Sequence, residues 1–483
     1  MRNLLLTIFL FSYFLALSQE KKVLSLEECI EIAIENNLNV RGSELSLQNA
    51  RINYSQAKAQ RLPTLNGQGN YGFNWGRSID PNTNDFVNQR INFNSIGFNS
   101  STPVLQGMQV TNGVKQAGAD LFASEYDLQR ARNDISLNVA SLYLTVILNK
   151  ELVENAEFQL ESAKQQLDQT KKLVASGALP IANELQLESQ VATNEVTLIN
   201  NQNALDLSLL DLKQALLLPP GEEIDLIIPD VQIDEDDLQD VNPLSVYNYA
   251  LANQPEIKAA EERVKSADLG LAIAKGAMIP SLSLNGTFNT NYSDAQDQIF
   301  RPDGGFEIRT NTTSNLTILD DSSTPVANRQ IGVISPTGTI EDYTVLDQWD
   351  DNLRYSVSLG LFVPILNGFN NRSNLQRAKV SVQQSELNAI GERNALYQTV
   401  ETSYRNALAT NRTYIASLKQ VASLEETYRA VENQYNNGAA NFTDYQVAAN
   451  NLFQAQSDLS RAKYDFIFRK KILDFYLGKS LSF

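Results

Sequence analysis

The sequence contains no histidine and a single cysteine, Cys29. Without an imidazole, the chain can form neither a Ser-His-Asp relay nor a histidine-ligated metal site. One cysteine allows no intrachain disulfide and no thiolate zinc cluster. We therefore predict no cofactor and no metal site, and we expect Cys29 to be a small core residue, as lone cysteines usually are.

Positive charge is also scarce, because 39 Lys and Arg residues stand against 56 Asp and Glu residues and leave a net charge of -17. Nucleic-acid binding draws its affinity mainly from Lys and Arg that neutralise phosphates, so this composition argues against a nucleic-acid partner. Long apolar runs are missing as well. No internal stretch reaches the roughly 18 consecutive apolar residues of a spanning helix, which excludes a bundle of membrane helices.

The N-terminal segment has the pattern of a secretory signal peptide. Arg2 precedes an apolar core, and a small-x-small cleavage site ends at Ser18. We predict that residues 1–18 are removed and that the mature chain begins at Gln19. The alternative is an uncleaved N-terminal anchor. The polar residues that follow the apolar core argue against it. Cys29 lies too far past the cleavage site to carry a lipid.

The rest of the sequence is internally repeated. The stretch LSLEECIEIAIENNLNV from Leu24 resembles NPLSVYNYALANQPEIKAA from Asn242. Landmarks then recur in the same order: Ala33 with Ala250, Pro63 with Pro280, Pro103 with Pro364, and Gly177 with Gly438. We predict a first structural repeat over 19–230 and a second over 244–483, each running helix, two strands, long helix, turn, helix.

Two segments stand outside the repeated pattern. The linker 231–243 carries an acidic run, which is typical of solvated chain and lacks the spacing of a calcium-binding loop. Its members are Asp234, Glu235, Asp236, Asp237 and Asp240. The second repeat also has an inserted loop around 300–350, rich in Ser, Thr, Asp and Gly, which we expect to be an external loop or a small surface hairpin.

Four segments alternate apolar and polar residues as strands do. They lie within 65–75, 91–104, 281–292 and 353–363. In the second segment the apolar parity changes between Phe93 and Ile96, which a bulge would explain. Such strands fit an outer-membrane barrel or a soluble sandwich equally well. Because the smallest barrels need about eight strands, a barrel built from four would have to be shared among chains.

Long helices are predicted between these strands. Apolar residues recur every seven positions from Leu121 to Val174, which is typical of a coiled coil. A helix of about 70 residues would be roughly 100 Å long. Turns at Gly177 and Gly438 would fold each long helix back on a partner, so we predict two antiparallel helical hairpins.

Rod packing in a stalk or a spacer is the plainer explanation of these helices. Prolines at the expected helix–strand junctions argue instead for one continuous object, because proline cannot continue a helix. These junction prolines are Pro63, Pro103, Pro280 and Pro364.

In its ordered landmarks the sequence resembles the TolC-type outer membrane efflux protein family. The resemblance covers nearly the whole mature chain and rests on LEECIEIAIENN, TPVLQG and VPILNG, both tip turns, and the closing FIFRKKILDFYLG. It implies a mainly α fold with β: a homotrimer in which each chain gives four membrane strands to a twelve-stranded β-barrel that is continuous with an α-helical periplasmic tunnel. The implied place is the bacterial outer membrane, in contact with its lipid.

The resemblance also implies a function. Members export small molecules, such as drugs, metal ions or other toxic compounds, or proteins, as the passive outer component of a tripartite efflux or type I secretion system. A periplasmic adaptor and an inner-membrane pump would dock at the helical tip, where the turns of Gly177 and Gly438 lie. By the same resemblance, selectivity for cargo lies largely with the pump.

Finally, the resemblance locates a periplasmic aperture. Aligned from Gly438, Tyr435 matches a tyrosine of the family's polar network, and Asp444 matches the first of two aspartates that ring the opening. The second aspartate, the network arginine and the network aspartate are replaced by Val447, Ala440 and Asn183. A ring of three Asp444 carboxylates would favour cations, whereas an acid in the first turn of a helix is equally expected for its dipole alone.

These residues bear on three classes of function. The export duct is favoured; a periplasmic structural or adaptor coiled-coil protein without a pore is the alternative. An enzyme using two carboxylates is disfavoured, because no acid pair at strand ends forms a cleft, so we predict no catalytic residue. The two tryptophans, Trp75 and Trp349, are expected near strand ends as interface aromatics, although strand packing would account for either.

Overall fold

The computed structural model describes residues 22–79, 84–228, 241–310, 316–319, 325–329 and 332–481. The predicted signal peptide and the acidic run from Asp234 to Asp240 lie outside the described residues. The chain divides into two compact units. Unit 1 comprises Met1–Gln56, Asn112–Leu271 and Asn374–Phe483, and unit 2 comprises Ala57–Thr111 and Ala272–Ser373.

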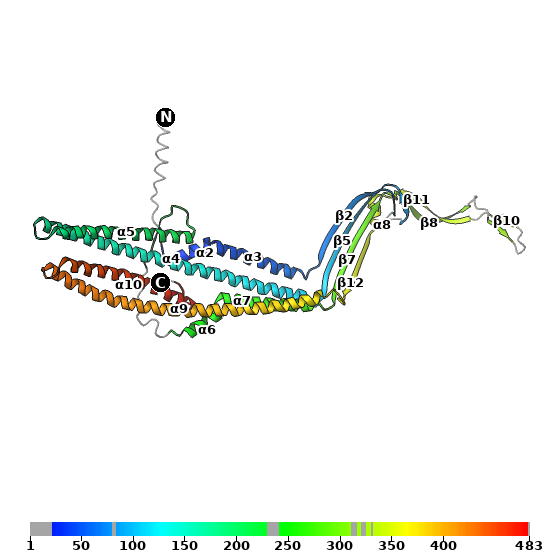
Figure 1. The fold of residues 1–483 in the computed structure, drawn as a ribbon. Helices are drawn as coiled ribbons and strands as arrows, with labels where there is room; N and C mark the ends of the chain where they lie inside the picture. Colours follow the sequence, from blue (N-terminus) through cyan, green and yellow to red (C-terminus); the bar gives the residue numbers. More distant parts are fainter. Residues whose placement is uncertain are drawn as a thin grey trace, which may run out of the picture. The chain divides into compact units, whose positions relative to one another are not determined.

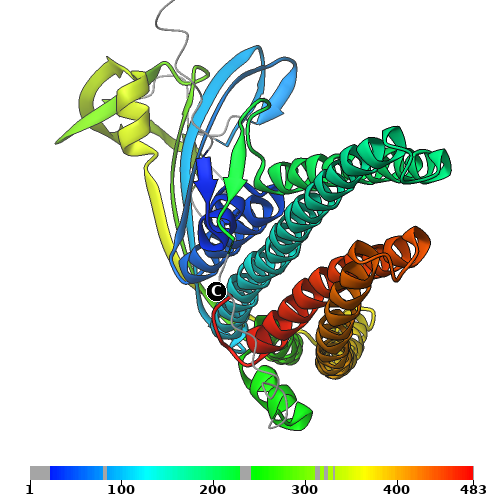
Figure 2. The ribbon, with the colours of Figure 1, turned by 90° about the vertical axis from the view of Figure 1, so that its left-hand side faces the viewer.

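Two antiparallel helical hairpins make up most of unit 1 (Figure 1). The first pairs α4 (Gln109–Ala175) with α5 (Ile181–Leu216), and the second pairs α9 (Asn370–Asn436) with α10 (Phe442–Tyr476). The two long helices have 67 residues each, as the uninterrupted heptads predict. Figure 2 shows both hairpins from their turn end, lying next to each other. None of the helices in the described ranges is long and apolar enough to cross a membrane.

The heptad positions are on the inner side of these hairpins. The buried members on α4 are Leu128, Ile135, Val139, Val146, Val153 and Leu160, and on α10 they are Leu452, Phe466 and Leu473. Ile467 of α10 is also buried and packs in one cluster with residues of α4. Burial of this seam supplies the main stabilisation of helices this long, since helical propensity alone is weak.

Each unbroken N-terminal helix of the predicted repeats is in fact two helices. α2 (Leu26–Asn36) is followed by α3 (Leu38–Ala59), and α6 (Pro243–Asn253) by α7 (Pro255–Gly276). The two breaks are alike: the carbonyl of Ala33 accepts the N–H of Asn37 at 2.8 Å, and that of Ala250 accepts the N–H of Gln254 at 2.8 Å. Both alanines are fully buried.

A short parallel pair of strands, which the sequence did not indicate, lies beside α2. β1 (Lys22–Leu24) pairs with β6 (Ile224–Leu226). The hydroxyl of Tyr143 on α4 lies 3.3 Å from the carbonyl of Leu24 and 2.5 Å from that of Ile227. These contacts attach the end of β1 and the residue after β6 to α4. Cys29 is fully buried in the same core, as expected, and burial raises the pKa of its thiol to about 12.

Unit 2 is built on a four-stranded antiparallel sheet in the order β12-β7-β5-β2. The strands are β2 (Thr64–Asn74), β5 (Ile91–Gln106), β7 (Ser281–Ser293) and β12 (Arg354–Phe362). These bounds agree closely with the four alternating segments. A short hairpin of β3 (Arg77–Ile79) and β4 (Phe86–Asn88), which the sequence did not indicate, follows β2.

The register gives the sheet two chemically different faces. Phe98, Phe288 and Tyr355 lie side by side on three neighbouring strands and mark the apolar face. The predicted bulge between Phe93 and Ile96 is wrong, because the pairing with β2 runs without a shift from Ile91 to Ser101. Phe93 simply lies on the polar face, where a Cβ on Gly72 would come within 3.0 Å of its ring.

The junction prolines need one correction. Pro63, Pro280 and Pro364 lie between a helix and a strand, but Pro103 lies inside β5. The β2 pairing ends at Ser101, and a bulge between Pro103 and Leu105 interrupts the β7 pairing, so a residue without an N–H fits there. The chain turns into α4 at Gly107, with φ +52, where a Cβ would collide with the carbonyl oxygen of Gly276.

The inserted segment forms a hairpin rather than an irregular loop. β8 (Gln298–Thr310) pairs with β11 (Gly332–Asp342) and leads into the short helix α8 (Val345–Asp351). A second, shorter pair joins β9 (Leu316–Leu319) to β10 (Pro325–Arg329). Of the two alternatives drawn from composition, the structure therefore has the hairpin.

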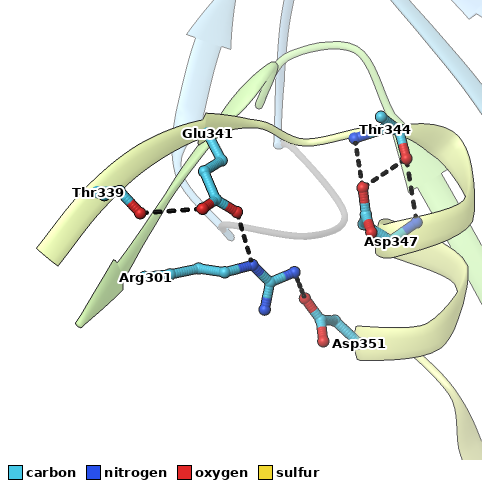
Figure 3. Close-up of polar contacts among 6 residues, drawn as sticks. All are labelled: Arg301, Thr339, Glu341, Thr344, Asp347 and Asp351. Carbon is cyan, nitrogen blue, oxygen red and sulfur yellow. Dashed lines mark hydrogen bonds and ion pairs between the residues drawn. The ribbon is translucent and has the colours of Figure 1, made fainter. Parts of the chain in front are cut away.

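Polar contacts hold this hairpin to α8 (Figure 3). The guanidinium of Arg301 lies 3.5 Å from the carboxylate of Glu341 and 3.6 Å from that of Asp351. Thr339 donates to Glu341 at 2.9 Å. Thr344 and Asp347 close a capping box at the start of α8, which satisfies its free N–H groups.

One buried amide ties α8 to the sheet. The side chain of Gln348 is fully buried; its Nε2 donates to the carbonyls of Ser293 and Gln296, and its Oε1 accepts the N–H of Ser293 at 2.9 Å. The next residue, Trp349, is half-buried on α8, and its Nε1 donates to Asn94 at 2.9 Å. Trp349 thus packs against the sheet, whereas Trp75 follows β2 and is exposed.

Candidate functional site

The candidate site is the turn end of the two hairpins in unit 1. Gly177 and Gly438 each have φ +76, a value that residues with a Cβ adopt at a cost. Gly177 donates to the carbonyl of Val174 and Ala178 to that of Leu173; the second turn repeats this geometry. These are the two bonds of a Schellman motif, which satisfies carbonyls at the end of a helix.

An aromatic cluster lies just inside the second turn. The ring of Tyr435, at the end of α9, stacks on Tyr445 of α10 with centroids 5.1 Å apart, and also lies 6.0 Å from Phe442. Tyr428 lies 5.7 Å from Tyr445. Leu187 of α5 is fully buried in the same cluster, so the cluster joins the two hairpins.

Polar links surround the same cluster. The hydroxyl groups of Tyr428 and Tyr445 lie 2.9 Å apart, and Tyr428 also donates to Glu432 at 3.0 Å. Gln166 of α4 donates to the hydroxyl of Tyr445 and accepts from Gln446 at 3.3 Å. The two bonds of Gln166 therefore join the hairpins through neutral tyrosine and amide groups, whereas both bonds of Tyr428 lie within the second hairpin.

A pocket of about 430 Å³ opens between the turns. Three of the five predicted aperture residues line it: Tyr435, Asn183 and Ala440. Its other polar lining residues include Gln166, Gln169 and Thr170 of α4, with Asn436 and Asn441 at the second turn. The structure thus brings these three aligned positions together, although no arginine or aspartate stands among the described residues that line the pocket.

The remaining two aperture residues lie on the outer side of α10. Asp444 is exposed, and its backbone N–H donates to the side chain of Asn441, the N-cap, at 2.9 Å. Val447, one helical turn further, is 53% exposed. Neither lines the pocket, so within one chain Asp444 points away from the cluster of Tyr435 and toward solvent. Its place in the first turn also suits the helix dipole.

Burial keeps the tyrosines of this cluster neutral. Burial is the first cause that raises the pKa of Tyr428, Tyr435 and Tyr445 above the ordinary value of 10.0. For Tyr428, the bond to Tyr445 raises the pKa further. The cluster therefore stays uncharged over the physiological pH range, and its bonds do not depend on titration there.

Tyr445 and Gln166 are the site residues that the sequence patterns did not identify. Tyr445 lies seven residues before Leu452 and so extends the heptad of Leu452 and Phe466 by one step toward the turn. That periodicity could have found it. Gln166 has no such pattern, because a polar residue beside a seam looks like any solvated position.

A match to a family profile identifies the family of this chain. The profile described as Outer membrane efflux protein matches residues 29–216 and 346–479, which is more than half of the chain. The chain belongs to the outer membrane efflux protein family. Both matched segments contain a complete hairpin with its glycine turn, and the inserted hairpin β8–β11 falls between them. The family is one of channel-type efflux proteins of the outer membrane, and the pore-less periplasmic adaptor is not favoured.

Individual relatives agree with the family match. The chain is 24% identical over 449 residues to the cation efflux system protein CusC of Escherichia coli O157:H7, which covers 90% of this chain and 82% of the relative. It is 28% identical over 192 residues to the outer membrane protein TolC of Vibrio cholerae, covering 40% and 43%. The solved structure of CusC has a TM-score of 0.73 with 18% identity, covering 96% of both chains, and so has the same fold.

Proposed function

We propose that this protein is the passive outer component of a tripartite efflux or type I secretion system. It forms a channel-tunnel that exports small molecules or proteins from the periplasm or an inner-membrane pump to the outside. The observation that carries the proposal is one chain that combines a two-faced antiparallel sheet with two long helical hairpins, inside a family of outer membrane channels.

We further propose that three copies build the channel. The outer strands of the sheet, β12 and β2, each have one unpaired edge among the described strands. Open edges are not tolerated in hydrocarbon, because their N–H and C=O groups lack water as a partner. Pairing β12 of one copy with β2 of the next in a ring of three removes every such edge and gives a barrel of twelve strands.

The partners proposed for the turn end are a periplasmic adaptor and an inner-membrane pump. The turns of Gly177 and Gly438 are exposed and share one backbone geometry, which presents two similar surfaces per chain. A partner could therefore bind the two turns of one chain through the same kind of contact. The similarity also supports two structural repeats, 19–230 and 244–483, joined by the linker 231–243.

The aperture is proposed to lie at the same end. Three exposed Asp444 side chains, one from each copy, would form an acidic ring, while Tyr435, Asn183 and Ala440 line the pocket behind it. Since Ala440 and Asn183 cannot form a salt link, closure depends on the tyrosine and amide contacts around Tyr445. This network is weaker than a charged one and is expected to open more readily.

Single-channel recording tests the function. Protein extracted from membranes with detergent and added to a planar bilayer should give discrete, long-lived conductance steps. Circular dichroism first shows that the preparation is folded. If the folded protein and its Asp444→Ala variant both fail to conduct at every voltage, that result would contradict a water-filled duct.

A further inference from the structure

The inserted hairpin β8–β11 carries an apolar stripe on one side. Cross-strand partners on this side are Ile308 with Ile334 and Phe300 with Ile340. With Phe306, these side chains form the stripe, and they are between 44% and 73% exposed. The opposite side holds the polar contacts of Arg301, Thr339 and Glu341.

A free two-stranded hairpin has marginal stability in water, and an exposed apolar side is unfavourable there as well. Lipid does not fit as the cover. β8 and β11 form a two-stranded sheet, so each has an open edge among the described strands, and open edges do not occur in hydrocarbon. The stripe therefore fits a protein surface.

A second exposed apolar patch lies at the other edge of the sheet. It consists of Trp75, Ile79 and Phe86, at or within the short hairpin β3–β4, and they are 74%, 52% and 67% exposed. The guanidinium of Arg77 lies 4.7 Å from the centre of the Phe86 ring.

Strand direction places the stripe and the patch at the same end of the sheet. Consecutive neighbours in β12-β7-β5-β2 are antiparallel, so β12 and β2 run in opposite directions. β2 ends at Asn74, directly before the patch, and β12 begins at Arg354, directly after α8 and the inserted hairpin. Wherever β12 of one copy lies beside β2 of another, the inserted hairpin of the first copy and the patch of the second therefore lie at the same end of the shared sheet.

We infer that the stripe of β8–β11 docks on the β3–β4 patch of a second copy of this chain, so that the inserted hairpin clamps neighbouring subunits together beyond the sheet. The inference rests on the shared sheet proposed above. Apolar contact between the two surfaces supplies the attraction.

Cysteine cross-linking tests the contact in the full-length protein. Ile340→Cys and Phe86→Cys are combined in one chain and treated with a short bismaleimide in detergent. Cys29 does not compete, because it is fully buried and its thiol pKa is raised to about 12. Covalent dimers and trimers are expected from the double variant and from neither single variant. The matched control combines Phe86→Cys with Thr339→Cys, because Thr339 is adjacent to Ile340 but lies on the opposite side of β11. This variant should not form cross-links.

The other outcomes decide against the contact. Cross-links from Ile340→Cys alone would mean that stripe packs on stripe, and no cross-links at all would mean that the stripe has another cover. The mass of the untreated sample separates these results from failure of the channel: a trimer without cross-links overturns only the docking, whereas a monomer overturns the shared sheet. As a second readout, Phe300→Ser with Ile340→Ser should lower the temperature at which the trimer dissociates. Leu346→Ser, at a residue of α8 that is 73% exposed, should not.

Discussion

The ring of Tyr435 lies on the ring of Tyr445 with 5.1 Å between centroids and 19° between planes. This pair connects the last turn of α9 to the first turns of α10, and the hydroxyl of Tyr445 reaches Gln166 on the other hairpin. The contact that holds the two hairpins together at the turn end is therefore aromatic and uncharged. Its strength is set by packing and neutral hydrogen bonds rather than by ion pairs.

Shortening Tyr445 in two steps should separate the two parts of this contact. Tyr445→Phe removes the hydroxyl bonds to Tyr428 and Gln166 and should cost about 0.5–1.5 kcal/mol. Tyr445→Ala also removes the buried ring and should cost about 3–5 kcal/mol. Hydrogen exchange of the α10 amides near the turn measures the free energy of local opening. Tyr397→Phe, on an exposed ring of α9, is the control, and equal effects of Phe and Ala at 445 would contradict the role of the ring.

Alanine should change stability in opposite directions at Gly438 and Gly391. Gly438 has φ +76, so Gly438→Ala forces a Cβ into the left-handed region and should destabilise the turn by about 1–2 kcal/mol. Gly391 lies inside α9 with open space around its Cβ position, so Gly391→Ala should stabilise the helix by roughly 0.5–1 kcal/mol. Hydrogen exchange around each position measures both, and a neutral Gly438→Ala would show that the turn geometry is not required.

Replacing Asp444 should change the ion selectivity of the channel and cost only about 0.3–1 kcal/mol of stability, through the lost interaction with the helix dipole. Asp444 is exposed on the outer side of α10, so Asp444→Ala removes charge and little contact. We expect the preference for cations over anions to fall severalfold in reversal-potential measurements, because three carboxylates leave one ring. Asp206→Ala, an exposed acid on α5, is the control. An unchanged reversal potential would remove Asp444 from the aperture.

The contact at the turn end should be insensitive to pH until the tyrosines ionise. Burial raises the pKa of Tyr435 and Tyr445 in the folded state above the ordinary 10.0. The folded state then holds these protons more tightly than the unfolded state, so their stabilising effect is complete below about pH 10 and is lost as the pH rises through the folded values. Local opening measured by exchange at about pH 6 to 9, after correction for intrinsic rates, should be constant. Opening that already increases within this range would point to a charged group.

Much of the fold was predictable because its patterns are long. Alternation along the strands identified β2, β7 and β12, and heptads along most of the helix identified α4, since each repeats one physical rule many times. The short pair β1–β6 and the hairpin β3–β4 have three residues per strand, too few for a period to show. The helix break at Asn37 was missed because both flanks are helical, so only the cap contact distinguishes it. The break at Gln254 could have been predicted, because Pro255 follows it and begins α7.

The candidate site was predictable only in part. The glycine turns and the neighbourhood of Tyr435, Asn183 and Ala440 follow from aligned positions. The contact between Tyr445 and Gln166 joins residues 279 apart in the sequence, and no local pattern announces it. Trp349 does lie near a strand end, just before β12, but on α8, a short helix that no sequence pattern indicated.

The central claim is that three chains share one barrel, and the oligomeric mass of the membrane-extracted protein in detergent tests it most directly. Native mass spectrometry, which strips the detergent, should give three times the mass of the mature chain, and dilution should not release single chains. A water-soluble protein that purifies without detergent with the mass of one chain would contradict the shared sheet, and the export function would fall with it.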